Sequence, residues 1–168
     1  MRWLKKEDSK ANRIAMTIAD GWQRVDSKRL PDGLLLDADA SIDLVLAVQP
    51  AHNRIAANLV VLHTPIPPGE DPSQALRDSA TILATSIPGM HMLDDCQWPI
   101  NNTTWSGRVR TGVYILDNTS LTVVQWAWVL SAPEGTCLWT ATMTSPTREF
   151  PERWNEVIPM IQSLEVRR

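Results

Sequence analysis

The sequence predicts an α+β fold, an antiparallel sheet of about six to seven strands flanked by α-helices, and three observations support it. Most apolar segments alternate with a period of two, and the connections between them are too short for crossover helices. Two other segments have a helical period, and only the sheet can bury their apolar stripes. A length of 168 residues, with 43% hydrophobic and 21% charged residues, fits one domain. We expect a flexible N-terminal tail at 1–11 and a single domain at 12–168.

The first half of the chain contains the strands of a predicted meander. "RIAMTIA" at 13–19 is closed by the turn "DGW", and "ANLVVLHT" at 57–64 has apolar residues on both faces. "LLLD" at 34–37 is a candidate short strand. The segment "SIDLVLAV" at 41–48 has one apolar face formed by alternate residues: Ile42, Leu44, Leu46 and Val48.

The segment "DPSQALRDSATILATSI" at 71–87 predicts a helix. Asp71 is a suitable N-cap, Pro72 fits the first helical position, and Gln74 can reach back as in a capping box. "PGM" at 88–90 ends the helix. One stripe is apolar at helical spacing: Leu76, Ala80, Leu83 and Ile87.

The second half contains three strands and a second helix. "WSGRVRTGVYIL", "LTVVQWAWVL" and "GTCLWTATMT" are separated by the turn-rich segments "DNTS" and "SAPEG". "FPERWNEVIPMIQSLEV" at 150–166 has a helical period, with Pro151 near its start. Pro159 is expected to kink this helix or to end its first segment. Its apolar face consists of Trp154, Val157, Ile158, Ile161 and Leu164.

Tryptophan is unusually frequent in this chain, which has eight Trp but one Phe and one Tyr. Trp126 and Trp128 are two apart and share a face of their strand, and Trp139 adds to one layer from the next strand. The opposite face is also apolar apart from Gln125, so we expect a central strand covered on both sides. These tryptophans are either a ligand-stacking platform or sheet core, and the two-sided burial favours core.

A candidate partner-binding surface consists of Trp98, Trp105, Arg108 and Arg110. The two tryptophans flank the polar segment "PINNTT", and the two arginines follow on the next strand. Mixtures of aromatic and cationic side chains are favoured at protein interfaces. The alternative is a loop that folds its tryptophans back onto the edge of the sheet.

The sequence contains no recognisable catalytic or metal site, and we expect a protein that is not an enzyme and binds no cofactor. His52, His63 and His91 are scattered, without metal-ligand spacing or a nucleophile motif nearby. Asp94 and Asp95, in "LDDC", are expected in a solvated loop rather than as an acid–base pair. A hydrolase that uses His63 or His91 stays open as an alternative.

The charge predicts a protein that binds no nucleic acid, and the N-terminal sequence predicts a cytoplasmic one. The net charge of −3 and the pI near 5.6 give no basic surface for nucleic acid. No apolar run is long enough for a signal peptide or a stable membrane insertion. Cys96 and Cys137 could form a disulfide, but in a reducing compartment we expect Cys137 to be a small buried apolar side chain.

Several short motifs resemble those of the PsbP-like α/β/α sandwich proteins, and among them the actinobacterial LpqN-type proteins of unknown function. The matching positions are Gly21-Trp22, for a "P-x-G-W" turn, and 161–164, for a closing "I-x-S-L". Ala19 stands where the family tends to have Pro. The resemblance covers about Asn12 to Val166. LpqN-type proteins usually carry an exported lipoprotein signal; its hydrophobic region and lipid-bearing Cys are not found here, which favours a cytoplasmic relative.

The resemblance implies a non-catalytic fold, used elsewhere in a photosystem accessory subunit, a partner of a small GTPase and a secretion-system chaperone. It transfers no active-site residues. The first hypothesis is therefore an adaptor or chaperone-like module, a monomer or homodimer that binds a protein partner in a secretion-linked role. The second is a carrier of a small amphiphilic ligand, in a pocket between sheet and helix lined by some of the tryptophans. The third is the uncharacterised hydrolase.

Overall fold

The computed structural model describes residues 5–8, 14–26, 40–49, 55–100 and 105–167. Its largest element is an antiparallel sheet in the order β3-β4-β5-β9-β8-β7-β6, and a smaller sheet has the order β1-β2-β10. The strands are β1 (Lys5–Asp8), β2 (Ile14–Ile18), β3 (Trp22–Arg24), β4 (Ser41–Val48), β5 (Asn58–Pro65), β6 (His91–Ile100), β7 (Trp105–Leu116), β8 (Thr119–Ala132), β9 (Gly135–Pro146) and β10 (Glu165–Val166). The helices are α1 (Pro72–Ser86) and α2 (Phe150–Gln162), and a short 3-10 helix, η2 (Thr147–Glu149), precedes α2.

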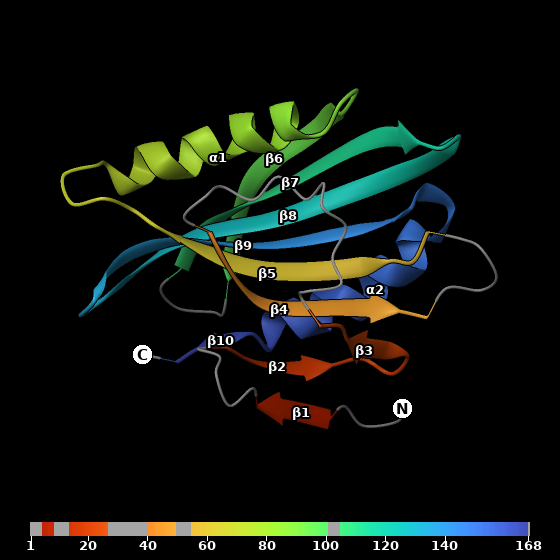
Figure 1. Cartoon of the computed structure of the whole chain (residues 1–168), viewed down its shortest axis with the longest axis horizontal. Coiled ribbons are helices and arrows are strands. Elements are labelled where there is room, and N and C mark those ends of the chain that lie inside the picture. The colour runs from red at the N-terminus through yellow and green to blue at the C-terminus, as the bar shows by residue number, and fades with distance from the viewer. Residues whose placement is uncertain (1–4, 9–13, 27–39, 50–54, 101–104, 168) are drawn as a thin grey trace.

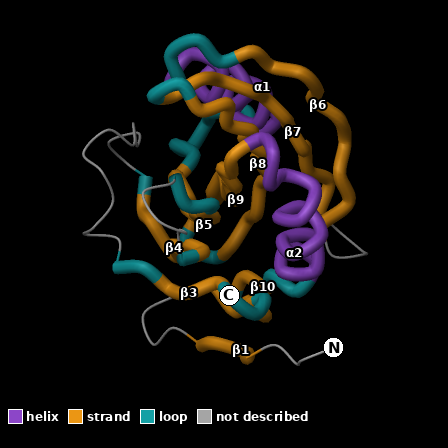
Figure 2. The backbone as a smooth tube through the Cα atoms, turned by 90° about the vertical axis from the view of Figure 1, so that its right-hand side faces the viewer, coloured by secondary structure: helices purple, strands orange, loops and turns teal. Residues whose placement is uncertain are grey.

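The molecule is layered around the seven-stranded sheet. α1 lies along the top of the sheet in Figure 1, and the small sheet lies at the bottom. Seen from the side, the strands of the large sheet follow an arc from β6 to β3 (Figure 2). The predicted α+β class, with an antiparallel sheet of six to seven strands flanked by helices, is confirmed.

Turn chemistry sets the two hairpins at the centre of the sheet. Asp117 and Asn118 connect β7 to β8 with φ angles of 47° and 60°. Tight hairpin turns need these left-handed conformations, which Asp and Asn tolerate better than most residues. Ala132 pairs with Gly135 at the β8–β9 hairpin, where Gly135 has a φ of 137°. The β7–β8–β9 register is therefore fixed at both ends of β8.

The α2 face of the sheet carries the main apolar core. Trp126 and Trp128 are fully buried, and Trp139 is 2% exposed. Trp126 stacks on Trp154 of α2, and Trp128 stacks on Trp139. These contacts confirm the prediction that the strand tryptophans form core. The Trp126 indole N–H has no hydrogen-bond acceptor among the described residues, although buried indoles usually have one.

A β-bulge changes the predicted face of β4. The register shifts between Ile42, which pairs with Leu62, and Leu44, which pairs with Val61. Leu44, Leu46 and part of Val48 belong to the α2-side core, as expected. Ile42 is opposite Leu62, on the α1 side, because the extra residue at the bulge inverts the alternation. The expectation that all four apolar residues share one face was therefore wrong for Ile42.

Both family-like motifs join the outer strands to α2. The Trp22 indole N–H donates to Glu156 Oε2 at 2.8 Å. Ser163, directly after α2, accepts a hydrogen bond from the Thr17 amide on its Oγ, and its hydroxyl donates to the Met160 carbonyl. The motifs thus hold β2 and β3 on the helix.

Helix α1 begins as predicted, but its cap differs in one detail. Asp71 accepts a hydrogen bond from the Ser73 amide at 3.0 Å, and Pro72 is the first helical residue. Gln74 does not complete a capping box; its side chain bonds Arg77 and Asp78 instead. The cap is therefore Asp71 alone.

Helix α2 runs through Pro159 to Gln162, so Pro159 does not end it. Proline has no amide to donate to the Asn155 carbonyl, so the helix continues through Pro159 with one backbone hydrogen bond fewer. The small sheet was not predicted, because β1 and β10 are only four and two residues long. β1 also lies within the segment 1–11 that we expected to be a flexible tail.

The segment "LDDC" is strand, not loop, because it lies within the edge strand β6. The candidate strand at 34–37 lies outside the described residues. Cys96 on β6 is exposed, Cys137 on β9 is half-buried, and no disulfide joins the two.

Replacing Trp126 by Ala should lower the free energy of unfolding by about 3–5 kcal/mol, because it removes a fully buried indole from a closed core. The matched change Trp98→Ala, at a half-buried indole, should cost only about 1 kcal/mol. Urea unfolding followed by circular dichroism measures both values. Equal losses of unfolding free energy in the two variants would show that Trp126 contributes no more to the core than Trp98 does.

Candidate functional site

A cavity of about 380 Å³ lies between α1 and the large sheet. This volume is within the range of about 300–1,000 Å³ that is usual for small-molecule sites. The cavity is on the sheet face opposite the tryptophan core, and no tryptophan is among the described residues that line it. The predicted pocket between sheet and helix is therefore present, but the prediction that tryptophans line it was wrong.

The sheet forms a mixed polar and apolar floor. β9 contributes a row of three hydroxyl groups, from Thr140, Thr142 and Thr144. Apolar residues of the neighbouring strands lie beside this row, because Val60 and Leu62 of β5 pair with Thr142 and Thr140. Directly paired residues of antiparallel strands point to the same face, so hydroxyl and apolar side chains alternate across the floor.

Helix α1 forms the opposite wall. Ser79 and Leu83 are buried against the sheet, and Ile82, Ser86 and Ile87 also line the cavity. Ile82 is 52% exposed although it is a large apolar side chain. The second half of α1 therefore presents an apolar surface that the sheet does not cover.

Arg110 of β7 holds the first half of α1 on the sheet. Its Nη1 donates to Ser79 Oγ at 2.8 Å and to Gln125 Oε1 at 2.9 Å, and its Nη2 donates to the Leu76 carbonyl at 2.7 Å. The Asp95 carboxylate lies 3.4 Å from its Nε. A side chain that is 1% exposed thus binds both the helix and the floor of the cavity.

Burial acts on two titratable groups near the cavity. It lowers the pKa of Arg110, which the Asp95 carboxylate partly counteracts. The guanidinium remains charged, because arginine normally titrates far above neutral pH. Burial also raises the pKa of Tyr114, which lines the cavity, against the opposing effect of a hydrogen bond to Thr144. Tyr114 is therefore a neutral hydroxyl group.

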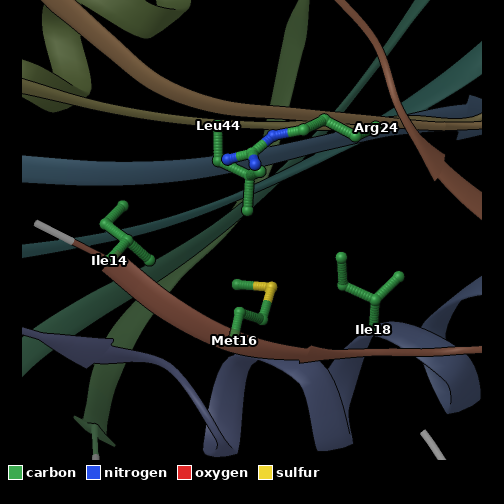
Figure 3. A pocket seen from close by; sticks show the side chains of 5 residues that line it. All are labelled: Ile14, Met16, Ile18, Arg24 and Leu44. Atoms are coloured by element: carbon green, nitrogen blue, oxygen red, sulfur yellow. The ribbon is translucent and has the colours of Figure 1, made fainter. Parts of the chain in front are cut away.

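A second, much smaller cavity lies between β2 and β4. Figure 3 shows Ile14, Met16 and Ile18 beneath Leu44, with Arg24 of β3 reaching across above them. Its volume is about 10 Å³, which holds at most one water molecule. This space is a packing gap and not a ligand site.

Trp98 and Arg110, two residues of the predicted partner-binding surface, lie on opposite faces of the sheet. Trp98 packs edge-on against Trp154 of α2, with ring centroids 6.4 Å apart, and lies against the core. Arg110 is buried under α1, on the other face, so it cannot contact a partner at the surface. Arg108 is half-exposed and pairs with Asp95 at 2.8 Å. The backbone of Trp105 pairs with Ile100, and its side chain lies outside the described part.

His63 has a carboxylate partner but lies away from the cavity. Its Nδ1 is 2.6 Å from Asp43 Oδ2, and its ring stacks on Trp139. Among the described residues no hydroxyl or thiol is hydrogen-bonded to its other ring nitrogen, as a nucleophile would be. His91 lies on β6, and His52 is outside the described residues.

The described residues also contain no group of His, Cys, Asp and Glu side chains that could hold a metal ion. In the same part of the chain, neither α1 nor α2 is both long and apolar enough to cross a bilayer.

The polar residues of the cavity floor were not predicted as a site. The available signal was the alternation of β9, where Thr140, Thr142 and Thr144 occupy the face opposite the core residues Trp139, Ala141 and Met143. A central strand under a helix should not carry a row of hydroxyl groups unless these groups have partners or open space. Gln125, noted only as an interruption of an apolar face, belongs to the same site.

Comparison with protein-family models gives no match for this sequence, and comparison with curated proteins gives none either. In structure the chain is similar to LpqN of Mycobacterium tuberculosis, a protein involved in cell envelope biogenesis. The TM-score is 0.73 and the identity 16%, over 92% of this chain and 83% of LpqN. It is also similar to the cyanobacterial PsbP protein of Synechocystis, with a TM-score of 0.66 and 11% identity over 99% of this chain and 94% of that one.

A protein of unknown function from Pseudomonas aeruginosa is similar as well, with a TM-score of 0.55 and 12% identity over 94% and 95% of the two chains. The chain therefore has the PsbP-like fold, with LpqN-type structural relatives, as the sequence motifs predicted. Identities this low establish the fold and transfer no activity.

Replacing Arg110 by Met should lower the free energy of unfolding by about 3 kcal/mol, because it leaves buried acceptors on α1 and β8 without a donor. Arg108→Met removes the neighbouring, half-exposed partner of Asp95 and should cost less than about 1 kcal/mol. Chemical denaturation gives the two values. Hydrogen exchange should also speed up in α1 for the Arg110 variant only, and unchanged exchange there would contradict the anchoring role.

Proposed function

We propose that this chain is a non-catalytic binding protein that holds a small amphiphile in the cavity between α1 and the sheet. The observation that carries the proposal is the composition of this cavity. It combines about 380 Å³ of space with an apolar helix wall and a floor of hydroxyl and amide groups. A ligand with one apolar and one polar part fits such a lining better than a wholly polar or wholly apolar one.

The apolar wall supports the proposal energetically. The wall consists of Ile82 and Leu83 of α1 and of Ile87, directly after the helix, and the floor includes Val60 and Leu62 of β5. Removing apolar surface from water is worth about 25 cal/mol per Å², so a chain that fills this space gains several kcal/mol. The exposure of Ile82 supports the same reading, because a ligand at this wall would cover it.

The absence of reactive groups from the described lining supports a binding role rather than catalysis. The titratable side chain that lines the cavity there is Tyr114, whose raised pKa keeps it protonated. General acid–base chemistry near neutral pH needs a group that titrates in that range. The Asp43–His63 pair is the better acid–base candidate, and it is not among the residues that line the cavity.

A protein-binding adaptor is the second candidate, supported by exposed apolar side chains at another place. Ile115 and Leu116, at the end of β7, are 73% and 47% exposed, and Leu93 on β6 is 62% exposed. Exposed apolar side chains of this size are frequent at protein interfaces. The hairpin end of the sheet replaces Trp98 and Arg110 as the surface to test for a partner.

Filling the cavity should weaken ligand binding. Leu62→Trp places a large side chain at a half-buried lining position, so a lauroyl amphiphile should bind at least about tenfold more weakly. Leu93→Trp is the matched control, because it adds the same side chain at an exposed position outside the cavity. Isothermal titration calorimetry below the micellar concentration measures both affinities. Equal affinity in the two variants would exclude the cavity as the site.

A further inference from the structure

We infer that the cavity selects the oxygen of an acyl head group, a carboxylate or an ester carbonyl, and rejects cationic amphiphiles. This inference rests on the proposed function and specifies its ligand. Two observations support it: the hydrogen-bond donors of Gln125 and Thr142 face the cavity, and the charged group bonded to Gln125 is the guanidinium of Arg110.

Arg110 fixes the orientation of the Gln125 amide. A guanidinium has donors and no acceptor, so Gln125 must turn its Oε1 toward Arg110, at 2.9 Å. Its Nε2 then points along the floor, where it makes one long hydrogen bond, 3.4 Å to Thr142 Oγ1. Among the described residues this is the sole partner of the Nε2 group, which has two protons. At least one amide proton of a side chain that is 8% exposed is therefore available on the cavity side.

The hydroxyl of Thr142 continues the same polarity. Its oxygen accepts from Gln125, and no described residue accepts a hydrogen bond from its own proton, which can therefore be donated to a ligand. Hydrogen bonds run from Arg110 to Gln125 and from Gln125 to Thr142, and each leaves a donor on the cavity side. We call this series of side chains, which begins at Asp95, the relay. The unused protons at the end of this relay need an acceptor on the ligand. Acyl oxygens meet this condition, whereas a quaternary ammonium group has neither an acceptor nor a proton to donate.

The ion pairs next to the relay have the matching charge. Arg110 and Arg108 share the one carboxylate of Asp95, so these three side chains together carry a net positive charge. None of the described residues that line the cavity is acidic. A positive field with low solvent access favours an oxygen carrying negative charge and opposes a cation. Neither a cation nor a carboxylate has a counter-charge among the described lining residues, and burying an unpaired charge costs several kcal/mol. The Arg110 guanidinium lies behind Gln125, hydrogen-bonded to it at 2.9 Å, so its charge lowers this cost for an anion and raises it for a cation.

The rest of the lining places the acyl chain. Ile82, Leu83 and Ile87 form the wall above the floor, and Val60 and Leu62 flank the threonine row. A head group at Thr142 would leave its chain between these residues. The relay and the apolar wall are adjacent, so one ligand can use both.

The test compares three amphiphiles with the same chain: laurate, monolauroylglycerol and dodecyltrimethylammonium, titrated below their micellar concentrations into the full chain. We expect at least one of the two acyl compounds to bind at least about tenfold more tightly than the ammonium compound. The tighter of the two identifies a free acid or an ester as the source of the oxygen. Dodecyltrimethylammonium binding as tightly as both acyl compounds would overturn the inference and leave the carrier function standing. Binding of none of the three would contradict the carrier function itself.

Thr142→Val tests the relay directly, because valine keeps the shape and removes the hydroxyl. The better acyl compound should bind about three- to tenfold more weakly, and dodecyltrimethylammonium should be unaffected. Thr136→Val is the matched control on the same strand, since Thr136 is not a described lining residue and instead contacts Ser131. An equal loss for acyl and ammonium ligands, or an equal loss in the Thr136 variant, would overturn the role of the relay.

Discussion

Strand β8 has to be buried on both faces, and the positions of both helices follow from this requirement. Trp126 and Trp128 on one face need an apolar cover, which α2 and the small sheet supply. Val123 and Ala127 on the other face are also fully buried, and α1 lies on that side. A central strand with two apolar faces cannot be solvated on either side, so a helix on each face is the simplest arrangement that buries both.

The two covers are built differently, and the difference creates the site. On the α2 side, stacked indoles fill the space between sheet and helix. On the α1 side, the floor carries hydroxyl and amide groups that cannot be covered by apolar side chains without losing their hydrogen bonds. Arg110 satisfies these groups at one end and holds α1 there. In the second half of α1, Leu83 is buried and Ile82 is exposed, and both line the cavity.

The sequence predicted what depends on local periodicity and chain chemistry. Alternation identified the central strands, and the Asp71 cap located the start of α1. The strand β6 was missed because an edge strand with Asp94, Asp95 and Gln97 shows no apolar alternation. The cavity could not be predicted from local sequence patterns. The distance between α1 and the sheet depends on contacts of Arg110 with Ser79 and Leu76, which are 31 and 34 positions away in the chain. Arg110 was expected at the surface for the same reason, because the residues of α1 that cover it are distant in the sequence.

The most direct test of the claim that the cavity between α1 and the sheet binds an amphiphile is to locate the residues that a bound amphiphile contacts. Methyl-labelled nuclear magnetic resonance spectra, recorded with and without laurate or monolauroylglycerol, distinguish the two faces of the sheet. We expect shifts confined to cavity methyl groups such as those of Leu62, Ile82 and Leu83, with the methyl groups of Leu46 and Met143 on the α2 side unchanged. Shifts centred on the α2-side methyl groups or on Ile115, with none in the cavity, would contradict this claim.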